Sequence, residues 1–287
     1  MVYLIFSIIA STSIFVIFKI IEKLKINTFS AILINYIVAA SLGFILYKNP
    51  VSISEIVNQP WFFFSFFIGA LFILMFYLIA LSSQKVGISV TTVASKMSVI
   101  IPIAFSIFYY NENINILKIV GICIAIVAVF LTIMKKKQDK KQVKYFLLPM
   151  LLFIGMGIVD STVKFSQDKF ALDDSSSLFS AVVFTVSGIM CIIVSFFNLK
   201  IFKNYLQPKV LLMGIILGIT NFGTIYFIIN ALNSNIFDSS ILFGINNIGI
   251  VAASVIIGLL GFKEKLSGIN WIGIFLSFVA ILALSYA

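Results

Sequence analysis

The chain has 287 residues, of which 61% are hydrophobic and only 10% are charged, and its formal net charge is +10. Soluble globular domains contain about 45–50% apolar and about 25% charged residues. The composition therefore excludes a soluble enzyme, a nucleic-acid-binding domain and a secreted module. All 20 cationic side chains are lysines, and we interpret this positive charge as a membrane-topology signal rather than a nucleic-acid patch.

Apolar runs long enough to cross about 30 Å of hydrocarbon as helices occupy nearly the whole chain. They predict an all-α membrane protein with ten transmembrane helices, at residues 2–22, 27–47, 61–84, 88–110, 114–134, 145–168, 176–198, 208–230, 237–261 and 267–286. Strands are not expected, because the runs are about twice the length of a barrel strand and do not alternate. The first run is followed, not preceded, by lysines, so we expect a retained helix rather than a cleaved signal peptide.

The residue inventory contains no machinery for common catalytic or cofactor chemistry. The chain has no histidine, and its two cysteines, Cys123 and Cys191, lie in separate apolar runs where we expect buried packing residues. No hydrolase or nucleotide-binding motif is present. We therefore expect no catalytic residue, no metal, no cofactor and no enzyme activity. Any transport must depend on a gradient or on exchange, unless a separate subunit drives it.

A basic segment at residues 135–144 divides the chain into similar halves, 1–134 and 145–287. The number of positions between matching residues grows from 150 to 152 along the chain, and small insertions in loops would produce such a growth. The matches are Phe29-Ser30-Ala31 with Phe179-Ser180-Ala181, Ala80-Leu81 with Ala231-Leu232, Glu112 with Glu264, and Gly121 with Gly273. Five helices per half is an odd number, so the halves have opposite orientations in the membrane. The sequence thus predicts two inverted five-helix repeats, an architecture of secondary transporters with a substrate site near mid-membrane.

This chain resembles the drug/metabolite transporter superfamily over essentially its whole length. The resemblance rests on the ten helices in two repeats, on the Ala80-Leu81 step, and on the Glu-then-Gly pattern, which is similar to the EamA-type repeat. It implies a single-chain permease of the inner or plasma membrane that moves a small organic solute. It also implies a central cavity lined by helices one to four and six to nine, with helices five and ten peripheral.

Lysines are distributed unequally between the two sides of the membrane. The connectors after odd-numbered helices hold 15 of them, and those on the other side hold Lys48, Lys118, Lys164 and Lys169. The positive-inside rule places the lysine-rich connectors in the cytoplasm and both termini outside. The family resemblance implies the opposite orientation, and we follow the charges.

Lys96 is the first candidate for a substrate-binding residue. It lies near the centre of the fourth span, where ionisable groups are costly and mark function by default. Pro102 cannot donate to the carbonyl of Ser98, so we expect that oxygen to be free for water or a ligand. A lysine ammonium here can hold the carboxylate or phosphate of a substrate; a structural ion pair is the alternative.

Asp160, in the sixth span, is the second charged candidate. The repeat aligns it with Ala10, near the middle of the first span. Two partners for it stay open: Lys164, one helical turn away, or Lys96 across the cavity. In the cavity it would balance a cationic group or a coupling proton. A zwitterion such as an amino acid fits Lys96 and Asp160 together.

Uncharged polar residues complete the predicted site, and interhelical hydrogen bonding is the alternative role for each. They are Ser95, Asn246, Asn247, Tyr77, Asn35 and Asn230. Because the repeat aligns Asn246-Asn247 with Ser95-Lys96, we expect Lys96 and Asn247 to face one cavity. Asp238, Glu112 and Glu264 precede helices and are expected to cap them.

The sequence therefore predicts a secondary transporter for an amino-acid-like or other anionic or zwitterionic solute, working by alternating access. Its partners are the small-molecule substrate and the lipid bilayer, with no nucleic acid, and both a monomer and a homodimer fit. A flippase for lipid-linked substrates or an accessory membrane subunit on the same scaffold is the alternative function.

Overall fold

The computed structural model describes residues 1–47, 52–111, 114–134, 145, 147–170, 176–196, 205–234 and 236–287. All regular structure within these ranges is helical, with no strand. Ten helices are long and apolar enough to cross a membrane, and each overlaps one predicted run. The prediction of an all-helical protein with ten candidate membrane-spanning helices is confirmed for the described residues. The basic segment at 135–144, Lys48 and Glu112 lie outside the described residues.

The spans are formed by eleven of the helices, since two helices share the fourth span. Their bounds are α1 (Val2–Lys23), α2 (Thr28–Leu46), α4 (Phe62–Lys85), α5 (Ile88–Met97), α6 (Ile100–Tyr109), α7 (Ile116–Ile133), α9 (Leu147–Phe170), α10 (Ser176–Phe196), α12 (Pro208–Asn233), α13 (Ser239–Phe262) and α14 (Gly268–Ser285).

A short helix that the sequence did not predict, α3 (Ile53–Val57), lies in the connector before α4. Its first turn is closed by a capping box. The backbone N–H of Glu55 donates to the Ser52 hydroxyl at 3.2 Å, and the N–H of Ser52 donates to the Glu55 carboxylate at 3.0 Å. This pattern was readable in the sequence, but five residues are too few for a periodicity signal.

The fourth span is interrupted at Ser98 and Val99, between α5 and α6. Pro102 has no N–H to donate to the Ser98 carbonyl, as the sequence predicted. The carbonyl is not free, however, because the chain tightens and the Ile101 N–H donates to it at 2.9 Å. The expectation of a vacant acceptor was wrong, since an i→i+3 hydrogen bond compensates for the missing proline donor.

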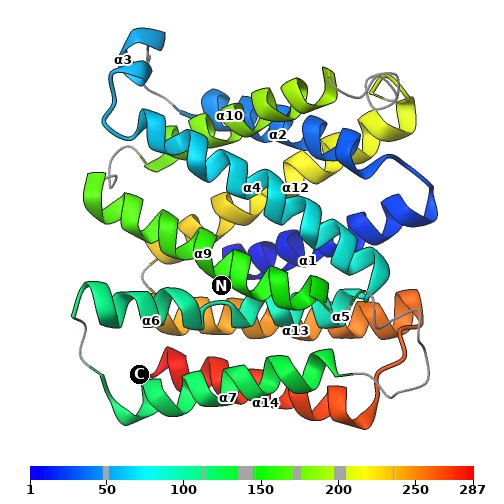
Figure 1. Cartoon of the computed structure of the whole chain (residues 1–287), viewed down its shortest axis with the longest axis vertical. Coiled ribbons are helices and arrows are strands. Elements are labelled where there is room, and N and C mark those ends of the chain that lie inside the picture. The colour runs from blue at the N-terminus through cyan, green and yellow to red at the C-terminus, as the bar shows by residue number, and fades with distance from the viewer. Residues whose placement is uncertain are drawn as a thin grey trace. The chain divides into compact units, whose positions relative to one another are not determined.

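The described chain forms two compact units, each containing segments from both sequence halves. The first unit comprises Met1–Lys19, Leu78–Ile158 and Gly223–Ala287. In it α7 and α14 lie side by side, and α13 packs against both α5 and α14 (Figure 1). Its largest apolar core joins these four helices, with buried residues such as Val93, Met97, Val251 and Val255.

The α7–α14 contact is antiparallel and close. Gly121, near the start of α7, packs directly against Leu284 near the end of α14, while Gly273 packs against Thr132 near the end of α7. The Asn270 side chain, at the start of α14, donates to the carbonyls of Thr132 at 2.7 Å and Met134 at 2.8 Å. These bonds satisfy carbonyls that the end of α7 would otherwise leave without a donor.

The second unit comprises Ile20–Tyr77 and Val159–Phe222, and its main helix contact joins α2 to α10. Gly43 of α2 meets Ala181 of α10, where an added Cβ would lie 2.9 Å away. Gly214 and Gly218 bring the first half of α12 against Ile34 and Val38 of α2. Small residues thus permit close approach of helices, a common solution where neighbouring helices gain little from burying apolar surface in lipid.

Candidate functional site

The α5–α13 pair positions most of the predicted site residues in the first unit. Ser89, in the first turn of α5, packs against Gly258 near the end of α13. Val93 and Met97 share a core with Val251 and Val255. This order of contacts shows that the two helices run antiparallel.

Lys96 lies beside this helix contact. It follows Ser89 by seven residues, which is two helical turns, and so shares a stripe of α5 with it. On α13, Ser254 and Asn247 precede Gly258 by four and eleven residues and share a stripe in the same way. Lys96 and Asn247 are half-buried, whereas Ser254 is fully buried. The register therefore places these three polar residues along one side of the α5–α13 contact, and we call them the polar stripe.

Several buried polar atoms in this unit have no hydrogen-bond partner among the described residues. Four of them are the Asn246 and Ser254 side-chain oxygens on α13 and the Ser7 and Thr12 hydroxyls on α1; the Ser83 and Tyr110 hydroxyls are the other two. Ile8 of α1 packs directly against Gly249 of α13, between Asn246 and Ser254. Other buried hydroxyls in the unit donate to their own helix, for example that of Ser106 to Pro102 at 2.8 Å and that of Ser277 to Ile274 at 2.6 Å. A buried hydroxyl without such a bond costs about 1–3 kcal/mol, so these groups mark places where a water or ligand would be stabilised.

The other two predicted residues of this unit have more local roles. Ser95 is buried, and its carbonyl accepts from the Ser98 hydroxyl at 2.6 Å. Asn230 is half-buried on α12 and donates to the carbonyl of Tyr226 at 2.8 Å.

Three predicted residues lie in the second unit. Asn35 is fully buried on α2, and with its amide oriented to suit its neighbours it donates to the Leu217 carbonyl at 3.2 Å. The same amide lies 3.2 Å from the side chain of Asn221. Tyr77 is 37% exposed and makes an edge-to-face contact with Phe29, and Asp160 is exposed on α9. The structure thus divides the predicted set, with Lys96, Ser95, Asn246, Asn247 and Asn230 in one unit and these three in the other.

Glu264 has a different role from the one expected. It was predicted to cap the helix that follows it, but α14 is capped by Ser267 in a capping box with Asn270. The Glu264 carboxylate instead accepts from the start of α5, from the Ile88 N–H at 2.5 Å and from the Ser89 N–H and hydroxyl at 3.1 and 2.7 Å. The negative charge stabilises the positive end of the α5 dipole. No signal in the sequence pairs residues 176 positions apart.

Two smaller expectations are also corrected. Asp238 occupies the N-cap position of α13, but its side chain accepts no capping hydrogen bond from the described residues. Cys191 is buried as expected, whereas Cys123 is exposed on α7, as a residue on a lipid-facing helix surface can be.

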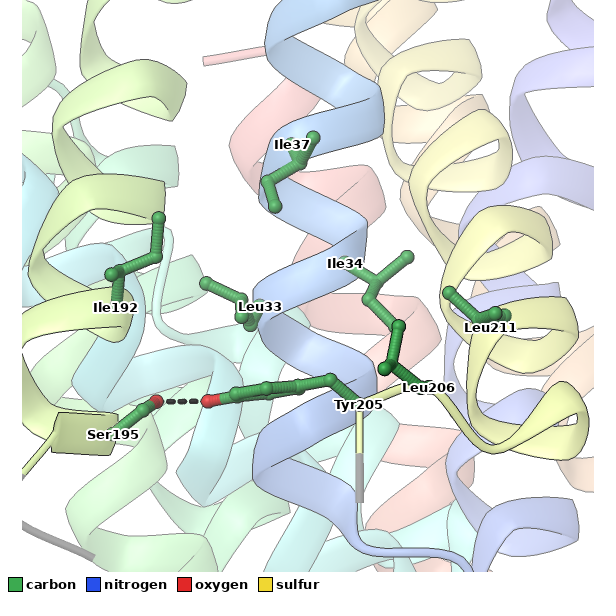
Figure 2. A pocket seen from close by; sticks show the side chains of 8 residues that line it. All are labelled: Leu33, Ile34, Ile37, Ile192, Ser195, Tyr205, Leu206 and Leu211. Atoms are coloured by element: carbon green, nitrogen blue, oxygen red, sulfur yellow. Dashed lines mark hydrogen bonds between the residues drawn. The ribbon is translucent and has the colours of Figure 1, made fainter. Parts of the chain in front are cut away.

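An apolar groove of about 310 Å³ lies in the second unit (Figure 2). It is lined by Leu33, Ile34, Ile37, Ile192, Ser195, Tyr205, Leu206 and Leu211. The Tyr205 and Ser195 hydroxyls are hydrogen-bonded to each other, as the dashed line in Figure 2 shows, so the lining presents hydrocarbon. Burial raises the pKa of Tyr205 above its ordinary value of 10.0, and the phenol remains a neutral donor at physiological pH.

The ten candidate spans and their buried polar groups define a multi-pass membrane protein. No family model matches the chain. It is 30% identical over 292 residues to an uncharacterized protein of Haemophilus influenzae, with 99% of this chain and 97% of that protein covered, and it belongs to the same family. A protein of known crystal structure superposes with a TM-score of 0.55 at 12% identity, covering 97% of each chain. That likeness shows a shared fold alone.

Proposed function

We propose that the protein is a secondary transporter of the drug/metabolite transporter type, built from two inverted repeats and located in the inner or plasma membrane. The observation that carries the proposal is the pairing of helices from equivalent positions in the two halves. The helix contacts α2–α10, α5–α13 and α7–α14 each join such a pair. The α7–α14 contact is also reciprocal. Gly121 packs against Leu284, and Gly273 packs against Thr132. The repeat offset of 152 residues converts the first contact into the second, because it relates Gly121 to Gly273 and Thr132 to Leu284. A two-fold axis in the membrane plane produces contacts of this kind.

The substrate we propose is a small anionic or zwitterionic solute such as an amino acid. Lys96 supplies a positive charge within a span, and the polar stripe places Asn247 and Ser254 along the same helix contact. Asp160 is the proposed partner of a cationic group or of a coupling proton. No catalytic step or cofactor is part of the proposal, and a gradient or exchange drives transport by alternating access of the site to the two sides.

A screen in two stages tests the proposal. Thermal unfolding of the purified protein is followed with amino acids, nucleosides, sugars and organic acids, because a solute that binds only the folded state raises Tm. Labelled solute from the responding class is then measured for uptake into proteoliposomes. We expect one anionic or zwitterionic class to stabilise the wild type and to be transported, Lys96→Ala to lose both effects, and Lys209→Ala, an exposed lysine at the start of α12, to retain both.

Two results contradict this reading in different ways. Equal responses of the wild type and Lys96→Ala show that Lys96 is structural. Transfer of labelled lipid between leaflets, with no solute uptake, favours the alternative of a lipid-linked substrate flippase. The apolar groove in Figure 2 is the observation on which that alternative depends, because an acyl chain matches a lining without free polar groups.

A further inference from the structure

We infer that Ser254 donates a hydrogen bond to the anionic group that Lys96 attracts, so that the two residues form one binding site for a carboxylate or phosphate. The inference deepens the proposed transport function and rests on it. Ser254 was not among the residues predicted from the sequence, because a single serine in an apolar run is usually a packing residue.

The first observation is the unsatisfied hydroxyl of Ser254. The residue is fully buried on α13, and its Oγ has no hydrogen-bond partner in the described part of the chain. A helical serine can normally donate to the carbonyl one turn earlier, as Ser285 does to Ile281 at 2.7 Å. Because Ser254 does not, its hydroxyl is available as a donor at a place where an unmet bond is costly.

The second observation is the register of α5 and α13. The contact between Ser89 and Gly258 serves as the reference level. At a rise of about 1.5 Å per residue, Ser254 lies about 6 Å from that level along α13, and Lys96 lies about 10 Å from it along α5. The helices are antiparallel, so both displacements run in the same direction along the contact. A lysine side chain leans toward the start of its own helix, which brings the ammonium back toward the level of Ser254.

The chemistry of these two groups specifies an anion. The ammonium supplies charge without a fixed direction, and the hydroxyl supplies one directed donor. Two oxygens of one carboxylate or phosphate can accept from both. Hydrogen bonds to a charged acceptor are about twice as strong as neutral ones, so the loss of either group is expected to weaken binding measurably.

The experiment compares Ser254→Ala with Ser277→Ala, whose hydroxyl is equally buried in the same unit but donates to Ile274 at 2.6 Å. Without ligand, we expect Ser254→Ala to unfold at or above the wild-type Tm, because no protein hydrogen bond is lost. Acetate, inorganic phosphate and sulfate are then titrated at ionic strength matched with chloride. We expect at least one of them to raise the wild-type Tm, with an apparent Kd about tenfold higher in Ser254→Ala, equivalent to about 1.4 kcal/mol. Ser277→Ala should bind as the wild type does, and Lys96→Ala should show only the nonspecific salt response.

Each other outcome overturns the inference. A lower Tm of Ser254→Ala without ligand assigns its hydroxyl to a structural bond. Equal anion affinity in the wild type and Ser254→Ala, with loss in Lys96→Ala, removes Ser254 from the site and leaves the proposed function standing. A wild-type response to none of the three anions beyond the chloride control removes the anion site altogether, while uptake of a labelled solute still decides transport separately.

Discussion

Replacing Glu264 by alanine should destabilise the protein, because it removes the carboxylate that accepts from the start of α5. The carboxylate accepts three hydrogen bonds from Ile88 and Ser89, and both residues are fully buried. The carboxylate packs closely at this helix start, because Gly87 (φ +129°) and Gly258 both lie against it, and a Cβ at these positions would be 2.9 and 2.6 Å from its oxygens. Each unmet buried donor costs about 1–3 kcal/mol, so we expect a loss of about 3–5 kcal/mol.

Thermal unfolding in detergent measures this loss, with Glu55→Ala as the matched control. Glu55 also accepts a backbone N–H, but in the exposed capping box of α3, where about 1 kcal/mol or less is at stake. We expect Glu264→Ala to lower Tm by about 5–10 °C, Glu264→Gln to lower it by less because one carbonyl acceptor remains, and Glu55→Ala to change it little. Equal Tm values for Glu264→Ala and Glu55→Ala would refute the reasoning, since they would mean that water satisfies the start of α5.

Three further perturbations follow from the packing and the charge distribution. Gly273→Ala should lower Tm through a clash with Thr132, by about 1–3 kcal/mol, whereas Gly268→Ala, which meets no atom within 4 Å, should not; equal effects would contradict the close α7–α14 contact. Asn35→Ala removes the bond to the Leu217 carbonyl and should cost about 1 kcal/mol in the same assay, and an unchanged Tm would show that the amide contributes nothing. The lysine distribution predicts that both termini lie outside. In bacteria, a green fluorescent protein fused after Ala287 should therefore not fluoresce, whereas alkaline phosphatase fused there should be active. A fluorescent fusion would show that the orientation is the opposite one.

The helices were predictable from the sequence because membrane hydrocarbon imposes a simple length rule. Each span needs about 20 apolar residues, and the ends of the runs coincide with the observed ends within a few residues. Pro102 likewise indicated a disturbance in the fourth span. Its outcome was not predictable, because closing an i→i+3 bond at Ile101 depends on small backbone rotations that leave no trace in residue types.

The site was less predictable because it depends on how helices face one another. Lys96 could be selected from its charge alone, since an ionisable residue within a span is conspicuous. Ser254 has no such signal, and only the contact of Ser89 with Gly258 reveals that it lies on the stripe of α13 beside Lys96. Glu264 shows the same limit, because its role depends on a loop meeting a distant helix start. Tertiary register is therefore the information that composition and periodicity lack.

Buried hydroxyls among the described residues divide into those that donate to their own helix and those that have no partner. A transmembrane helix can carry many Ser and Thr residues at little cost when each donates to its own backbone, as Thr132 does to Ala128 at 2.7 Å. Such residues loosen packing but offer nothing to a ligand. Ser7, Thr12, Asn246 and Ser254 keep polar atoms without a partner among the described residues, and all four lie on α1 and α13, to either side of the contact between Ile8 and Gly249. Tyr36, Ser83 and Tyr110 keep such atoms elsewhere among the described residues. Four of the seven therefore gather beside one contact between two helices, as a binding site for a polar solute requires.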